Sequence, residues 1–153
     1  MKGKNKMGVM GVGGKIAVVL VAALLPALLL SSYVPAQRIP STGYPTLYAV
    51  GGVLAAAGFS LNLLAAMHML RAHKQDRLAT GGLYRVFRDP MYVLQLFVTL
   101  PGLLLMAHSW LALLAIPAAY IAYRRFVREE HSWLQRRYGE AYTAYVKSVP
   151  IKL

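Results

Sequence analysis

Apolar residues gather in four long runs that polar and charged segments separate. The runs cover about residues 16–33, 46–70, 91–107 and 110–123. A helix of about 17–25 apolar residues crosses the hydrocarbon core of a bilayer, and the second run meets this length most clearly. Only His108 and Ser109 separate the last two runs, so they predict a helical hairpin. The pattern predicts an all-α integral membrane protein, with about four transmembrane helices in one domain over residues 1–153.

The first run has a second interpretation. Lysines precede it, and Val34, Pro35 and Ala36 follow it. A basic start, an apolar stretch and a small residue after it are also typical of a cleavable signal peptide. The three further runs favour a retained span, but the sequence leaves both readings open.

Small residues and prolines predict how these helices pack. Five small residues in the second run would let another helix approach closely: they are Gly51, Gly52, Ala55, Ala56 and Gly58. Pro101 and Pro117 lie inside the third and fourth runs. Proline lacks the backbone N–H that a helix interior uses, so we expect kinks or breaks at these two positions.

The chain turns polar after Tyr123, and a new periodicity begins. Leu134, Tyr138, Tyr142 and Tyr145 recur at spacings of four, four and three. This spacing predicts a C-terminal amphipathic helix on the membrane surface, and Gly139 predicts a break within it. Tyrosine is enriched where membrane meets water, so we expect these tyrosines to be interfacial anchors rather than site residues.

Composition supports a membrane protein and argues against other classes. The chain carries a formal net charge of +12, yet 58% of its residues are hydrophobic. A nucleic-acid-binding domain would be basic without being so apolar. The absence of Cys excludes disulfides, thiolate metal sites and cysteine nucleophiles. None of the four His forms the i, i+4 pair of a helical zinc site, so we expect no metal.

The basic residues predict the orientation. Of 17 Lys and Arg, 4 precede the first run, 1 follows it, 5 follow the second and 7 follow the last. The positive-inside rule then places both termini in the cytoplasm, and we expect a bacterial inner membrane. The segments 71–90 and 124–153 would face each other on that side. They could build one site at the lipid–water boundary.

Two motifs in these segments carry a family resemblance. The first is Thr80-Gly81-Gly82-Leu83-Tyr84-Arg85-Val86-Phe87-Arg88-Asp89-Pro90-Met91-Tyr92, and it is similar to T-x-G-x-Y-x-x-x-R-H-P-x-Y. The second runs from Glu129-Glu130 through Leu134, Tyr138-Gly139, Tyr142 and Tyr145 to Val149-Pro150, and resembles E-E-x-x-L-x-x-x-F-G-x-x-Y-x-x-Y-x-x-x-V-P. Together they resemble the isoprenylcysteine carboxyl methyltransferase and phospholipid methyltransferase superfamily.

The resemblance implies methyl transfer from S-adenosylmethionine to a lipid-like or prenylated carboxylate, or to an amine. The partners would be this acceptor and membrane lipid, with no nucleic acid. Carried over position by position, the cofactor-binding residues would be Arg77, Leu78, Ala79, Tyr84, Asp89, Pro90, Met91, Tyr92 and Glu129. The catalytic residues would be Glu129 and Arg125, whose planar donor fork would orient an acceptor carboxylate.

Three positions depart from the family pattern. Asp89 replaces the histidine of R-H-P, and Leu94 replaces a glycine that often follows the motif. Three residues instead of two separate Glu130 from Leu134, so either the helix carries an insertion or the equivalent pair is Glu130-His131.

The change at position 89 leaves alternative functions open. If position 89 contacts the cofactor through its backbone, the replacement of histidine by Asp89 is tolerated. If the imidazole is essential, the chain is a catalytically degenerate member that serves as a non-enzymatic membrane partner protein. A third alternative is a small membrane protein in which the motifs are coincidental.

Overall fold

The computed structural model describes residues 43–107, 109 and 111–152, together with positions 22, 25, 26, 29 and 33. The expected span over residues 16–33, and its signal-peptide alternative, thus lie outside the described residues apart from those few positions. The described elements are α2 (Tyr44–Lys74), η2 (Gly82–Arg85), α3 (Pro90–Leu94), η3 (Gln95–Thr99), α4 (Leu100–Met106), η4 (Leu111–Leu114), α5 (Ala115–Tyr138) and α6 (Glu140–Ser148). Every described element is helical, as the pattern predicts.

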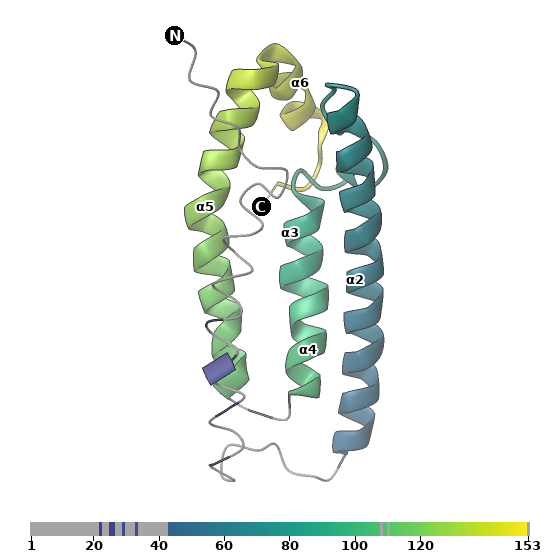
Figure 1. Ribbon diagram of the computed structural model, residues 1–153, viewed down its shortest axis with the longest axis vertical. Coiled ribbons are helices and arrows are strands. Elements are labelled where there is room, and N and C mark those ends of the chain that lie inside the picture. Colours follow the sequence, from purple (N-terminus) through teal and green to yellow (C-terminus); the bar gives the residue numbers. More distant parts are fainter. Residues whose placement is uncertain are drawn as a thin grey trace.

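Three long columns make up the described fold (Figure 1). They are α2, the stack of α3, η3 and α4, and α5. Helix α2 is the only described helix that is long and apolar enough to cross a membrane by length and composition. Pro90–Met106 forms a shorter apolar helix. The structure therefore supports one of the four expected spans by length, and the others remain predictions.

Helices α2 and α4 pack so closely that side chains would not fit between them. A Cβ atom added to Gly51 would lie 2.7 Å from the carbonyl oxygen of Gly102, and one on Gly102 would lie 2.5 Å from the nitrogen of Ala55. Gly58 is packed against Thr99 in the same way. By contrast, nothing lies within 4 Å of a Cβ on Gly52. The predicted close contact is confirmed at Gly51 and Gly58.

An apolar core joins the α3–α4 column to α5, as the hairpin prediction requires. Its buried residues recur every four positions on both sides: Tyr92, Leu96, Leu100 and Leu104 on the column, and Ala115, Ala119, Tyr123 and Val127 on α5. Residues four apart share one face of a helix, so two such rows can interlock. At one end of the core, the rings of Tyr92 and Tyr123 lie 5.3 Å apart.

The two prolines have different effects. Pro101 follows the π-helical turn η3. Proline has no backbone N–H to donate to the preceding turn, and the wider backbone of η3 accommodates this missing hydrogen bond. Pro117 lies in the first turn of α5, where no intrahelical partner is needed, so the expected break at this residue is wrong. Helix α5 continues without interruption to Tyr138, which joins the expected last span and the amphipathic segment into one helix. The predicted break at Gly139 is confirmed, with φ of 53° separating α5 from α6.

Candidate functional site

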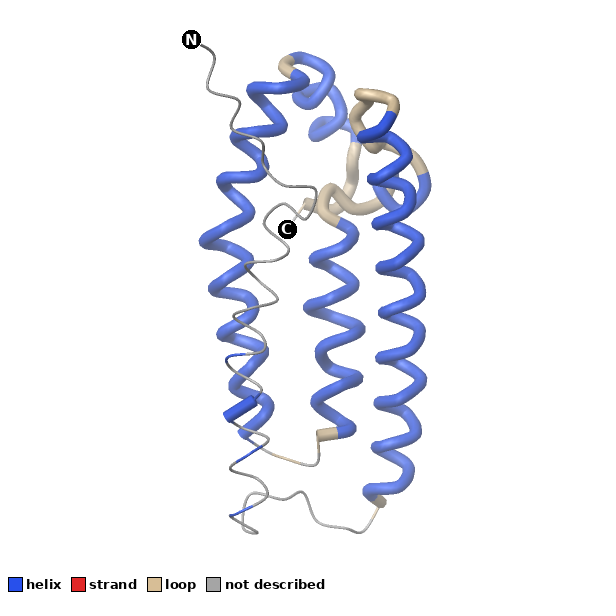
Figure 2. The backbone as a smooth tube through the Cα atoms, in the orientation of Figure 1, coloured by secondary structure: helices blue, strands red, loops and turns tan. Residues whose placement is uncertain are grey.

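The loop after α2 and the segment around α6 lie at the same end of the helices (Figure 2). Contacts tie them together directly. Arg137, near the end of α5, forms an ion pair with Asp76 in the loop. The Tyr138 hydroxyl also donates to the carbonyl oxygen of Arg77 over 3.4 Å. The two motif segments, distant in sequence, therefore meet.

Tyr145 holds the first motif in place from α6. Its hydroxyl lies 2.9 Å from the carbonyl oxygen of Tyr84 and 3.2 Å from that of Arg88. Beyond α6, Ile151 accepts a hydrogen bond from the backbone N–H of Arg88 at 3.0 Å and donates one to Val86 at 3.1 Å. The second motif thus acts as a support that fixes the backbone of the first.

Tyr142 and Tyr145 are therefore not the membrane anchors that the sequence predicts. Only 5% and 7% of their surfaces are exposed, and they pack in a cluster with Ala65, Tyr84 and Val149. Burial raises the pKa of Tyr142 to about 12, so its hydroxyl stays protonated at neutral pH. The expectation failed because an amphipathic face has the same spacing whether it packs on lipid or on protein.

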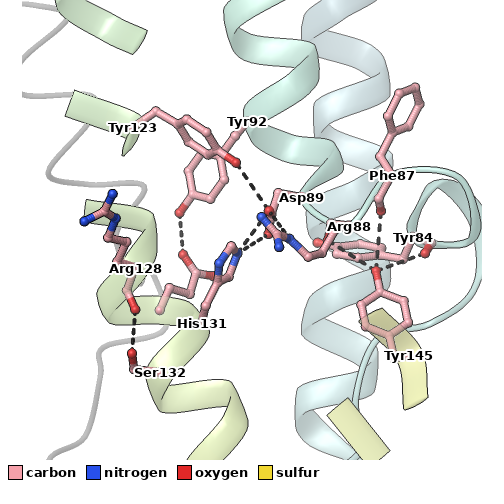
Figure 3. A network of polar contacts seen from close by, with 11 residues as sticks. Tyr84, Phe87, Arg88, Asp89, Tyr92, Tyr123, Arg128, His131, Ser132 and Tyr145 are labelled. Atoms are coloured by element: carbon pink, nitrogen blue, oxygen red, sulfur yellow. Dashed lines mark hydrogen bonds and ion pairs between the residues drawn. The ribbon is translucent and has the colours of Figure 1, made fainter. Parts of the chain in front are cut away.

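Asp89 is the centre of a polar network just before α3 (Figure 3). Both of its carboxylate oxygens lie 3.0 Å from Nε2 of His131, and Arg88 Nε donates to one of them at 2.9 Å. The Tyr123 hydroxyl donates to the same oxygen over 3.4 Å. Burial alone would raise the pKa of Asp89, but the hydrogen bonds and positive charge from His131 and Arg88 outweigh it and lower that pKa. Asp89 is therefore ionised and firmly held.

A second carboxylate lies beside the first. Glu130 on α5 accepts a hydrogen bond of 2.6 Å from the hydroxyl of Tyr92. Burial raises the pKa of Glu130, the charge of Asp89 raises it further, and the bond from Tyr92 offsets only part of that rise. One carboxylate of this site is stabilised in its charged form and the other is destabilised, so the two have different proton affinities.

The loop residues predicted to bind a cofactor have different positions. Arg77 is exposed, whereas Leu78 and Ala79 pack against the cluster around Tyr84. Pro90 is fully buried at the start of α3. The carbonyl oxygen of Met91 accepts a hydrogen bond from Asn62 of α2 at 3.1 Å. Tyr84, Asp89 and Tyr92 are the members that lie in or against the polar network.

The two predicted catalytic residues, Arg125 and Glu129, are exposed on α5. The residues that follow Glu129, namely Glu130 and His131, contact Tyr92 and Asp89. The sequence predicts no role for Tyr123, and it points to His131 only through the alternative pair Glu130-His131. That alternative comes from the spacing E-E-x-x-L, since counting back from Leu134 aligns the pair with Glu130 and His131.

Comparisons with known proteins identify a family. A family model described as phospholipid methyltransferase matches residues 45–141, more than half of the chain. The matched region contains α2 from its second residue, the α3–α4 column and α5, and with them Asp89, Tyr92, Glu130 and His131. No curated protein and no solved structure gives a significant match to the chain.

Proposed function

Because the chain belongs to the phospholipid methyltransferase family, we propose that it transfers a methyl group from S-adenosylmethionine to a lipid-like acceptor at the membrane surface. The observation that carries the proposal is the meeting of Asp89 and Tyr92 with Glu130 and His131 at one end of the helices. We place this end at the cytoplasmic face of a bacterial inner membrane, because the basic residues concentrate in the same segments.

The chemistry of the site fits a cationic, aromatic cofactor. When bound, S-adenosylmethionine supplies a methyl group that is made reactive by a positively charged sulfur. Two mostly buried carboxylates, Asp89 and Glu130, favour a positive charge nearby. The rings of Tyr92 and Tyr123 lie 5.3 Å apart, and their hydroxyls donate to Glu130 and Asp89, so aromatic rings that can attract a cation lie beside both carboxylates. We therefore assign Asp89, Tyr92 and Glu130 to cofactor binding, with the backbone of the first motif beside them.

The acceptor would come from the bilayer. Helix α2 exposes large apolar side chains along its length, among them Val53, Phe59 and Leu64. Such a surface suits lipid chains, and α2 ends beside the loop that carries the first motif. The protein then mainly positions the acceptor atom in line with the methyl group. A carboxylate acceptor needs no base, whereas an amine must first lose a proton, for which Glu130 and His131 are the candidate bases in this network.

The test uses the full-length protein in detergent or nanodiscs. Binding of S-adenosylhomocysteine is measured by calorimetry, and transfer of labelled methyl groups is measured across lipid fractions. We expect saturable binding, and we expect Glu130→Ala to weaken it about tenfold or more because a buried charged contact is lost. The neighbouring exposed residue provides the matched control, since Glu129→Ala should change binding less than about twofold.

Each alternative outcome has a clear meaning. The absence of saturable binding in a folded sample would overturn the methyltransferase proposal. Binding without transfer to any lipid fraction would support the non-catalytic alternative that Asp89 raises. Loss of binding in Glu129→Ala, with Glu130→Ala unaffected, would return the role to Glu129, the residue that the resemblance of the second motif implies.

A further inference from the structure

Two departures from the family pattern involve the same pair of chemical groups. Asp89 is a carboxylate where the motif R-H-P has an imidazole. When the second motif is aligned on Leu134, His131 is an imidazole where E-E has its second carboxylate. Taken separately, each departure removes a group from the motif. Taken together, they exchange a carboxylate and an imidazole between two positions 42 residues apart.

The exchanged residues touch each other. His131 Nε2 lies 3.0 Å from each carboxylate oxygen of Asp89 (Figure 3). Their side chains are only 19% and 8% exposed, so water screens the contact little. One residue precedes α3 and the other lies on α5, and this contact therefore spans the two motif segments.

Such a pair forms equally well whichever of the two positions carries the carboxylate and whichever carries the imidazole. An ionised carboxylate accepts a hydrogen bond from an imidazole N–H whichever segment supplies which partner. A single change would be different, because it would place two carboxylates or two imidazoles against each other. Two partly buried like groups cannot both ionise without a large cost. The pair can therefore be exchanged only as a unit.

The contact does more than neutralise Asp89. Arg88 already donates to the same carboxylate at 2.9 Å and can keep it charged. What His131 adds is a link to α5, and the preceding residue on that helix, Glu130, accepts the hydrogen bond from Tyr92. Fixing the imidazole on Asp89 thus fixes the rotation of α5 that points Glu130 at Tyr92.

We infer that His131 supplies the imidazole missing from position 89, and that Asp89 and His131 form one positioning unit that aligns the two motif segments. On this inference the substitution at position 89 does not make the chain degenerate. The inference rests on the proposed function for its catalytic consequence, but the pairing itself is a property of the fold.

A reciprocal exchange tests the unit. The variants are Asp89→His, His131→Glu and the double variant, which restores the order of groups in the family motif. We expect each single variant to lower kcat for methyl transfer about tenfold or more, since displaced groups lose alignment. The double variant should recover to within about threefold of the original kcat, and its melting temperature should also recover. The control is the exposed pair Asp76–Arg137, where Asp76→Asn, Arg137→Gln and their combination should change neither quantity appreciably, since Asn tolerates the positive φ of position 76.

A conservative variant separates positioning from folding. His131→Gln keeps a donor without an imidazole, so it should retain the fold, and its kcat should fall less than in His131→Glu. A double variant no better than the worse single variant in kcat would overturn the inference. If the original protein binds no cofactor and transfers no methyl group, the proposed function fails, and the melting temperatures still decide the pairing. Additive losses at positions 89 and 131 would then show that the two residues are not a unit.

Discussion

The hydroxyl of Tyr92 donates a hydrogen bond of 2.6 Å to the carboxylate of Glu130, which lies 38 residues further along the chain. Tyr92 is also the first residue in the row of buried side chains that packs the α3–α4 column against α5. The same side chain therefore belongs to the apolar core and to the polar network. Packing of the hairpin and geometry of the site cannot change independently at this residue.

Removing the Tyr92 hydroxyl should therefore destabilise the protein as well as the site. Tyr92→Phe keeps the ring but leaves a buried carboxylate without its donor, and such a loss costs about 1–3 kcal/mol. Denaturation in detergent measures the free energy of unfolding. Tyr120→Phe is the control, because Tyr120 is exposed on α5, one turn before Tyr123, and should change stability by less than about 0.5 kcal/mol. Equal effects of the two variants would show that the bond to Glu130 contributes nothing.

The Asp89 carboxylate should matter far more than the Asp76 carboxylate. Asp89→Asn weakens its contacts with Arg88 and His131 in a buried setting, and we expect a loss of about 1–3 kcal/mol in the free energy of unfolding. Asp76 is 78% exposed in its pair with Arg137, so Asp76→Asn should cost less than about 1 kcal/mol. Thermal unfolding of both variants at neutral pH makes the comparison, and the reverse order would contradict the electrostatic description of the site.

The two carboxylates should give opposite pH dependences. The pKa of Asp89 is lowered from 3.8, so its stabilisation is present above that value and is lost as the pH falls through the pKa of the folded state. The pKa of Glu130 is raised from 4.5, so the folded state binds the proton more tightly. Stability therefore falls as the pH rises from 4.5 through the higher pKa of the folded state.

Glu130→Gln isolates the second effect. The amide oxygen still accepts from Tyr92, but it carries no charge to bury. The variant should equal or exceed the original protein in unfolding free energy at pH 7, and the difference should shrink as the pH falls below 4.5. Unfolding curves collected across this pH range give the measurement. A variant whose deficit grows toward neutral pH would mean that the charged form of Glu130 is favoured in the fold.

Close packing of α2 on α4 gives a prediction that is independent of the site. Gly102→Ala would place a Cβ 2.5 Å from the backbone nitrogen of Ala55, so the helices must separate, at a cost of about 1–3 kcal/mol. Gly52→Ala meets nothing within 4 Å and removes a poor helix former, so it should be neutral or stabilise by up to about 1 kcal/mol. Melting temperatures of the two variants in the same detergent should move in opposite directions or differ clearly in size.

The sequence was most informative where one pattern has one structural meaning. The small residues around Gly51 and Gly58 predicted a close helix contact, and Gly139 predicted the end of a helix. The membership of Asp89 and Tyr92 in a common site also followed from the motifs as a prediction, and the structure brings both into one network.

The sequence was least informative about how each helix is rotated about its own axis. Glu129 and Glu130 are adjacent and chemically identical, yet consecutive residues on a helix point about 100° apart. Only the packing of α5 decides which carboxylate faces Tyr92. The inward direction of Tyr142 and Tyr145 was hidden for a related reason, because spacing defines a face of a helix without saying what covers it.

The π-helical turn Gln95–Thr99 controls this kind of rotation in the neighbouring column. Positions four apart drift by about 40° per step in a regular α-helix, and over the three steps from Tyr92 to Leu104 the drift would reach about 120°. A π-helical turn holds more residues per revolution and offsets part of that drift in this column, whereas the row on the α-helix α5 carries all of it. A one-residue deletion in this turn would rotate α3, and Asp89 before it, away from α5. The angular setting of the motif thus depends on the length of this five-residue segment more than on its side chains.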